Sequence, residues 1–306
     1  MRIALFCATQ RGLRCLQSLR ELVPDAQLLV FSFQEDPWEP PFLDAIRQQA
    51  LAYDAPFYET KQVARLTDVW ESQPVDLMLA ISWRYLIPAS VYERACLGAY
   101  VIHDSLLPAY RGFSPTVWAM MNGEDHTGAT LLEMVDDYDA GAIIGQERVP
   151  IGPDETIGDV MEHVTGAYVR LLRAHLPALL AGTAARAVQD ESQATYTAKL
   201  VPDDFRINWA WPSERIYNLI RATTAPYAGA YTTLNGQRLR IWTARRLDNP
   251  RRYVGRIPGR VAEIRGDEGV VIMTGDGLLL VTEAQLDDGE RVPAAHLLKR
   301  MADTLV

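Results

Sequence analysis

One segment of the chain, residues 98–146, constrains the fold more than any other. Its apolar run, residues 99–102, predicts a buried strand that ends at His103. A second apolar run, residues 129–135, leads into an acidic turn that contains Asp139. We therefore expect two strand ends to face one cleft, one carrying an imidazole and the other a carboxylate, which is a common pairing in acid–base chemistry.

The first third of the chain predicts an α/β fold with a doubly wound, mostly parallel sheet. Residues 2–7 and 27–33 have the length and apolar character of strands, and residues 12–22 place leucines on one helical face. A strand, a helix and a strand in this order are typical of parallel sheets. The intervening turn, residues 8–12, lacks the three spaced glycines that a pyrophosphate requires, so we expect no nicotinamide cofactor.

The composition indicates a folded protein without a membrane segment. The 306 residues are 48% hydrophobic and 23% charged, which suits one large domain or two smaller ones. No apolar run approaches the ~18 residues of a membrane span and no basic leader precedes the first strand, so we expect a cytoplasmic location and no membrane partner. The three cysteines, Cys7, Cys15 and Cys96, lack metal-ligand spacing, so we expect reduced thiols and no metal.

Residues 98–146 also carry many characteristic residue types at fixed intervals. They are His103, Ser105 to Pro108, Tyr110-Arg111-Gly112, Pro115, Trp118, Gly123-Glu124, Thr127-Gly128 and Asp139-Ala140-Gly141. This pattern resembles the signature of the N10-formyltetrahydrofolate-dependent formyltransferases. The resemblance extends over nearly the whole chain, and it is strongest to the methionyl-tRNA formyltransferases and the UDP-amino-arabinose formyltransferases. It implies N10-formyltetrahydrofolate as the formyl donor.

The resemblance also implies two domains. A Rossmann-like formyltransferase domain is expected over residues 1–190, a connector over about 183–203, and a smaller open β-barrel of the oligonucleotide-binding type over 204–306. The residues agree with this division, because short strands in the last third alternate with turn signals such as Asn235-Gly236 and Asp276-Gly277.

Transfer of a formyl group to an amine requires an acceptor for the proton of the attacking amine and a proton for the departing nitrogen. An imidazole can move both protons, and a nearby carboxylate orients the ring and stabilises its charged form. His103 and Asp139 fit these two roles. The resemblance implies the same assignment.

The family's third catalytic residue is an asparagine two positions before the histidine, on the same face of the strand. Here that position is Val101, whose side chain donates no hydrogen bond. Loss of one oxyanion donor typically costs ~2.7–4 kcal/mol. Asp104 is expected to point to the opposite face, and its carboxylate would repel an oxyanion. Three hypotheses follow: another group supplies the donor, the enzyme is slow, or the protein is a folate-binding protein or a formyl-folate hydrolase.

The resemblance implies further residues for the donor and the acceptor. For the folate it implies Tyr85, Leu86 and Ile87 after the fourth strand, and Val135, Asp136, Asp137 and Tyr138 in the acidic turn. The carboxyl end of a central strand is also where doubly wound sheets bind ligands. Ordinary packing is the alternative explanation of residues 85–87. For the acceptor it implies Ser105, Tyr110 and Phe113, although the amino-arabinose branch has an arginine at the position of Phe113.

The charge distribution bears on the acceptor. The chain has a formal net charge of −9, yet residues 201–306 hold 15 Lys and Arg against 13 Asp and Glu. Arginines concentrate at positions 238, 240, 245, 246, 251, 252, 256 and 260, which suits phosphates or simply a solvated surface. The turn 34–41 is acidic and proline-rich, where the tRNA-acting branch typically carries a basic loop. We therefore expect a nucleotide-linked amino sugar or another small amine as acceptor, with methionyl-tRNA as the alternative.

Overall fold

The computed structural model describes residues 1–36, 39–72 and 74–306. They form two compact units. The first contains Met1–Pro115, His126–Pro150 and Met161–Ala198, and the second contains Thr116–Asp125, Ile151–Val160 and Lys199–Val306.

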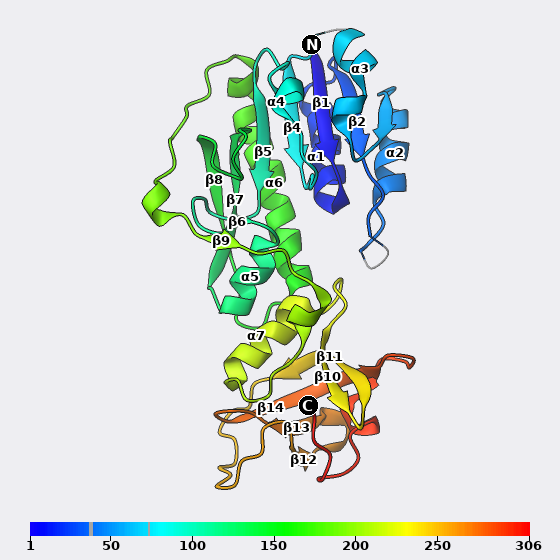
Figure 1. The fold of residues 1–306 in the computed structure, drawn as a ribbon, viewed down its shortest axis with the longest axis vertical. Coiled ribbons are helices and arrows are strands. Elements are labelled where there is room, and N and C mark those ends of the chain that lie inside the picture. The colour runs from blue at the N-terminus through cyan, green and yellow to red at the C-terminus, as the bar shows by residue number, and fades with distance from the viewer. Residues whose placement is uncertain (37–38, 73) are drawn as a thin grey trace. The chain divides into compact units, whose positions relative to one another are not determined.

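The first unit is built on a seven-stranded sheet with the order β3-β2-β1-β4-β5-β7-β8 (Figure 1). The strands are β1 (Arg2–Cys7), β2 (Gln27–Ser32), β3 (Phe57–Glu59), β4 (Leu77–Ile81), β5 (Ala99–His103), β7 (His126–Glu133) and β8 (Ile143–Pro150). The pairs from β3 to β5 are parallel, whereas β7 is antiparallel to both β5 and β8. The expected mostly parallel α/β sheet is confirmed.

Helices connect the parallel strands, and their apolar faces are buried by packing against the sheet. They are α1 (Thr9–Leu22), α2 (Leu43–Ala52), α3 (Thr67–Ser72) and α4 (Ala89–Tyr92), with a 3-10 turn η1 (Val63–Arg65), whereas α6 (Ile157–Leu180) follows β8. On one face of the sheet, Phe6 and Phe31 pack with Val63, Trp70 and Val91 from these connections. Alternate strand residues point to this cluster, as the period of two requires. Helix α1 begins at Thr9, three residues before the start expected from the leucine pattern.

The position of β7 overturns one expectation from the sequence. Its register pairs His103 with Thr130 and Tyr100 with Glu133, so the carboxyl end of β7 lies beside the amino-terminal part of β5. The prediction that two strand ends face one cleft is therefore wrong. Asp139 instead reaches His103 from the loop 134–142, which follows β7 and returns to β8.

Much of the expected connector lies in the first unit. Its strand β9 (Tyr196–Thr197) pairs in parallel with β6 (Arg111–Gly112), and a 3-10 turn η2 (Glu191–Gln193) precedes it. Contacts group the chain with the first unit as far as Ala198. The boundaries 1–190 and 204–306 remain a proposal.

The second unit contains an antiparallel sheet with the order β10-β11-β14-β13-β12, with β15 paired to β14. The strands are β10 (Ala230–Leu234), β11 (Gln237–Arg245), β12 (Val261–Ile264), β13 (Val270–Met273), β14 (Leu278–Leu286) and β15 (Val292–Pro293). Helix α7 (Ser213–Thr223) buries Ile216, Leu219 and Ile220 against inward-facing strand residues. The expected small β domain is confirmed.

Smaller elements complete the described chain. They are α5 (Pro115–Asn122), η3 (Pro202–Phe205), η4 (Gly266–Glu268) and η5 (Ala294–His296). Across residues 1–36, 39–72 and 74–306, no helix combines the length and apolar character that crossing a membrane requires.

Candidate active site

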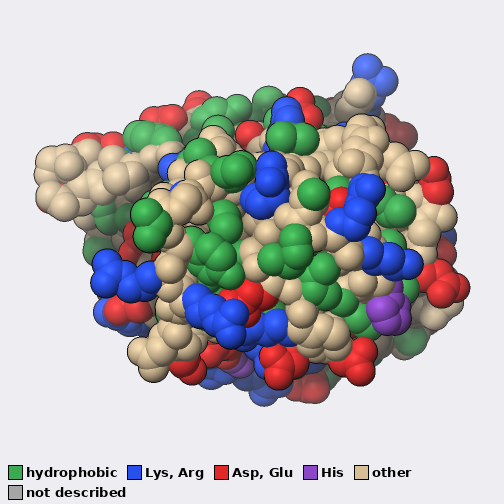
Figure 2. Space-filling view, turned by 90° about the horizontal axis from the view of Figure 1, so that it is seen from below, with side chains coloured by type: hydrophobic (Ala, Val, Ile, Leu, Met, Phe, Trp, Pro, Cys, Tyr) green, Lys and Arg blue, Asp and Glu red, His purple; other side chains and the backbone are tan. Residues whose placement is uncertain are grey.

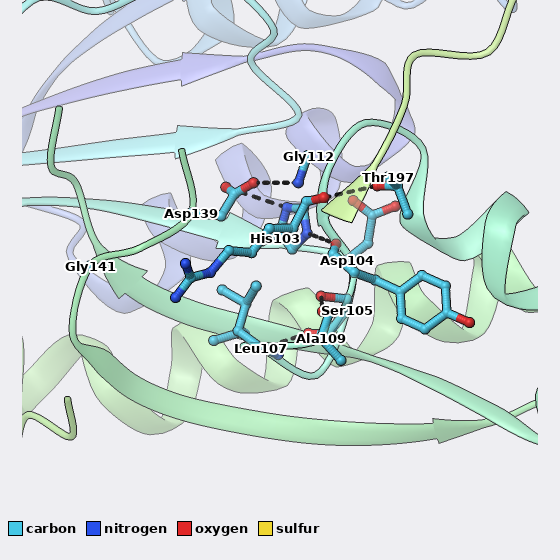
Figure 3. A network of polar contacts seen from close by, with 12 residues as sticks. His103, Asp104, Ser105, Leu107, Ala109, Gly112, Asp139, Gly141 and Thr197 are labelled. Carbon is cyan, nitrogen blue, oxygen red and sulfur yellow. Dashed lines mark hydrogen bonds and ion pairs between the residues drawn. The ribbon is translucent and has the colours of Figure 1, made fainter. Parts of the chain in front are cut away.

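His103 ends β5 with only 7% of its surface exposed. Its Nε2 lies 2.9 Å from the carbonyl oxygen of Tyr110, and its Nδ1 lies 3.5 Å from Oδ1 of Asp139 (Figure 3). Both of these oxygens accept hydrogen bonds, so the neutral ring can donate to one of them and the protonated ring can donate to both. The ring therefore lies between two acceptors and can carry a proton on either nitrogen.

Asp139 is held in place by its own loop and by β6. Its Oδ2 accepts a hydrogen bond of 2.8 Å from the backbone N–H of Gly112. Its backbone has a φ of 51°, a left-handed conformation that is uncommon for a residue other than glycine. The structure thus brings together the two residues that the sequence analysis assigned to acid–base chemistry.

Val101 and Asp104 lie on opposite sides of the strand. Val101 packs against the apolar cluster that contains Ala99 and Val91. The carboxylate of Asp104 instead lies 2.8 Å from Nη1 of Arg11 and accepts a hydrogen bond of 3.3 Å from the hydroxyl of Tyr168. Burial raises the pKa of Tyr168 well above its usual range, so this hydroxyl keeps its proton. Asp104 is therefore turned away from the face that carries His103.

The residues expected to contact the folate lie in two loops. After β4, Leu86 is 75% exposed whereas Ile87 is buried, and the ring of Tyr85 packs edge-on against Phe33 at 4.8 Å. In the loop after β7, Val135 and Tyr138 are also exposed apolar side chains.

A hydrogen bond ties these two parts of the chain together. The hydroxyl of Tyr92 in α4 donates to Oδ1 of Asp136 over 2.8 Å, and this bond raises the pKa of Tyr92. Asp137 accepts from the backbone N–H of Tyr138. The loop after β4 also holds a buried donor, Nε1 of Trp83, which has no hydrogen-bond partner among the described residues. Exposed apolar side chains suit a flat heteroaromatic ligand.

The residues expected at the acceptor have different surroundings. The hydroxyl of Ser105 is buried and donates to the carbonyl of Ala109 over 2.7 Å, so it stabilises the turn. Tyr110 supplies its carbonyl to His103 and has a φ of 60°. Phe113 is 45% exposed. Among the residues that the structure describes, no group of three or more His, Cys, Asp and Glu side chains is placed to hold a metal ion.

Residues of the connector form hydrogen bonds around this site, and the sequence analysis did not identify them. Gln189, Thr195 and Thr197 hydrogen-bond to residues 110–113 or to the Asp139 loop. The segment has weak periodicity and its strand has two residues, so no pattern marks it. Arg111 was part of the signature, but its buried position could not be read from it.

The comparisons with known proteins match both units. Residues 38–175 match the family described as formyl transferase, and residues 199–302 match the formyl transferase C-terminal domain. The chain is 38% identical to the methionyl-tRNA formyltransferase of Moorella thermoacetica over 234 residues, which cover 76% of this chain and 73% of that protein. The chain belongs to the formyl transferase family. Members of this family are enzymes that transfer formyl groups.

Solved structures share the fold of this formyl transferase family member. An N-formyltransferase from Helicobacter canadensis, in complex with folinic acid and dTDP-3-aminofucose, superimposes with a TM-score of 0.70 at 18% identity, over 95% of this chain and 99% of that chain. HypX from Aquifex aeolicus, in complex with tetrahydrofolic acid, superimposes with a TM-score of 0.66 at 22% identity, over 97% of this chain. The present chain spans 47% of HypX.

Proposed function

We propose that the protein transfers a formyl group from N10-formyltetrahydrofolate to the amino group of a small acceptor, such as a nucleotide-linked amino sugar. The observation that carries this proposal is the pairing of the buried His103 ring with the Asp139 carboxylate. Membership of the formyl transferase family supports the reaction type. The exposed apolar side chains of the loops after β4 and β7 support a folate donor.

The proposed chemistry is an acyl transfer. The neutral amine attacks the formyl carbon, a carbon–nitrogen bond forms, and the carbonyl oxygen becomes an oxyanion. His103, with Asp139 beside it, accepts the proton of the attacking amine and returns a proton to N10 as the carbon–N10 bond breaks. A positioned general acid–base group typically contributes ~10²–10⁴-fold to the rate.

The acceptor is inferred from the turn 34–41. The buried carboxylate of Glu35 accepts from the backbone N–H of Phe42 over 2.9 Å, at the start of α2. Asp36 and Glu39 pair with the guanidinium of Arg84. Pro37 and Trp38 of the expected acidic turn lie outside the described residues. The turn has no lysine or arginine of its own, which supports a small acceptor over an RNA.

Methionyl-tRNA is the second candidate acceptor, and two observations favour it. One is the 38% identity to a methionyl-tRNA formyltransferase. The other is a hollow of about 140 Å³ in the second unit, lined by Arg251, Arg252 and Arg256. Against it, the face in Figure 2 shows Lys and Arg side chains in separate groups among carboxylates and apolar side chains, rather than as one continuous basic stripe.

The experiment measures tetrahydrofolate formation from N10-formyltetrahydrofolate with nucleotide amino sugars, small amines and methionyl-tRNA. We expect turnover that depends on a small amine and that falls by ~10²–10⁴-fold in His103→Ala. His163→Ala, an exposed histidine on α6, is the matched control and should keep full activity.

Other outcomes of the same assay would replace the proposal. Turnover with methionyl-tRNA alone, with a steep salt dependence, would select the second candidate. Formate release that needs no acceptor would indicate a hydrolase. Tight folate binding without turnover on any amine would indicate a folate-binding protein, the reading that Val101 motivates.

A further inference from the structure

We propose that Gln189 is a positioning residue for the reaction, because its side chain fixes the loop that carries Asp139. Gln189 belongs to residues 183–198, which we call the strap. The inference rests on the proposed role of Asp139 and adds a residue that no sequence motif marks.

The strap forms hydrogen bonds to residues 110–113, the segment that contacts both His103 and Asp139. Its Thr195 accepts from the backbone N–H of Arg111 over 2.8 Å and, through its hydroxyl, from the N–H of Tyr110 over 2.8 Å. Its Thr197 donates to the carbonyl of Arg111 over 3.0 Å, and Figure 3 shows Thr197 close to the His103 site. This ordered segment provides the carbonyl that His103 contacts and, through Gly112, the N–H that Asp139 accepts.

Gln189 uses both ends of its amide. Its Nε2 donates to the backbone carbonyls of Asp139 over 2.7 Å and Gly141 over 2.8 Å. Its Oε1 accepts from Nη2 of Arg111 over 2.8 Å and from Nε over 3.2 Å. With 7% of the residue exposed, no water needs to complete these bonds. The site therefore requires two donors on one side and an acceptor on the other, which a glutamine provides and a glutamate does not.

Arg111 fixes the direction of this amide. Its side chain is 1% exposed, and it pairs with Glu191 of η2 over 2.7 Å. A guanidinium donates but never accepts, so it requires the oxygen of Gln189 to face it and turns the NH₂ group toward the Asp139 loop. Because a buried cation is costly to leave without its partners, Arg111 also keeps Gln189 and Glu191 of the strap in place.

The Asp139 loop needs this external support. A non-glycine residue in a left-handed conformation is strained and persists where its surroundings over-determine it. Asp139 has such a conformation, and Gly141 packs so tightly that a Cβ there would lie 2.0 Å from the carbonyl oxygen of Glu133. The two hydrogen bonds from Gln189 hold the loop at both of these residues.

The test variant replaces the NH₂ group of Gln189 by an oxygen and keeps the shape of the side chain. Gln189→Glu retains an acceptor for Arg111 but presents an acceptor to the two carbonyls. The matched control is Gln193→Glu, the same chemical change at an exposed glutamine of the same strap. We expect Gln189→Glu to lower kcat by about 100-fold, the cost of a small misplacement of a catalytic group, with a much smaller change in KM for the folate. Gln193→Glu should leave both constants unchanged.

Two further measurements separate positioning from general stabilisation. The backbone amide of Gly112 donates to Asp139, so its hydrogen exchange in the folded protein should accelerate in Gln189→Glu and not in Gln193→Glu. In an Asp139→Ala background, Gln189→Glu should cause no further loss of kcat, because residues that act through one group are not additive.

The inference and the proposed function would be overturned by different results. An unchanged kcat and an unchanged exchange rate of Gly112 in Gln189→Glu would show that Gln189 has no positioning role, and so would full additivity with Asp139→Ala. If His103→Ala kept full activity, the proposed function would fail, and the exchange of Gly112 would still decide whether Gln189 fixes the Asp139 loop.

Discussion

At the scale of single residues, Val101 is the side chain that most affects the expected rate. It lies two positions before His103 on the same face of β5 and packs into an apolar cluster. The oxyanion of the proposed reaction thus receives no hydrogen bond from this position. The buried His103 ring still lies beside the Asp139 carboxylate, so the proposed reaction keeps its acid–base pair and lacks only this source of electrostatic stabilisation.

Val101→Asn should therefore raise activity. An added oxyanion donor is worth ~10²–10³-fold in kcat where it reaches the developing charge. Val101→Thr, which is close to valine in shape, is the control for polarity alone. Steady-state kinetics on both variants with the best acceptor provide the measurement. If Val101→Asn is folded but no faster than the natural protein, another group already supplies the donor.

At the scale of elements, the strap contributes Glu191 to an ion pair whose other partner, Arg111, is buried. The hydrogen bond from Arg111 lowers the pKa of Glu191 in the folded protein. A carboxyl group with a lowered pKa contributes stability above its unfolded pKa, and this contribution is lost as the pH falls through the folded value. Glu191 is 65% exposed, so salt screens much of the interaction.

Glu191→Gln should accordingly lower the Tm at neutral pH, and the difference from the natural protein should disappear as the pH falls well below the usual glutamate pKa of about 4.3. Thermal unfolding between pH 3 and 7 at about 0.05 M salt measures this. Glu93→Gln, at an exposed glutamate, serves as control. A Tm difference that persists at the acid end would show that the ion pair is not its source.

The elements also show where sequence reasoning succeeds. Strands β1, β2, β4 and β5 were predictable because each is a buried apolar run of ordinary length, and His103 was predictable from its place at the end of β5. The route by which Asp139 reaches His103 was not predictable, because apolar periodicity does not distinguish an antiparallel β7 from a parallel one. The strap escaped prediction for another reason: its hydrogen bonds, from side chains and from backbone, join it to groups that lie more than forty residues away in the sequence.

At the scale of the whole molecule, the chain forms two units that differ in how their long irregular segments are held. The strap of the first unit is fixed by backbone hydrogen bonds, such as the pair that joins Ala187 and Ile143 in both directions. Residues 246–259 of the second unit are instead irregular and mostly exposed, with Arg251 at 79% side-chain exposure. Local opening is easiest where few backbone groups are paired.

Limited trypsin digestion should consequently cut first after Arg251, Arg252 or Arg256 and spare Arg186 in the strap. Arg186 is partly exposed, yet its guanidinium pairs with Glu133 and its neighbour Ala187 is bonded to β8. Mass spectrometry of the earliest fragments identifies the site, and replacing the three arginines with glutamine should delay the first cut. An initial cut after Arg186 would contradict this account of the strap.

The strap also has a consequence for how such proteins can be recombined. In the sequence the strap resembles a connector between two domains, which is the usual crossover point when chimeras exchange the C-terminal halves of related proteins. Here a crossover before Ala198 would separate strap residues such as Gln189, Thr195 and Thr197 from the loops to which they form hydrogen bonds. Functional chimeras of this protein are therefore expected to inherit residues 183–198 together with the half that contains His103.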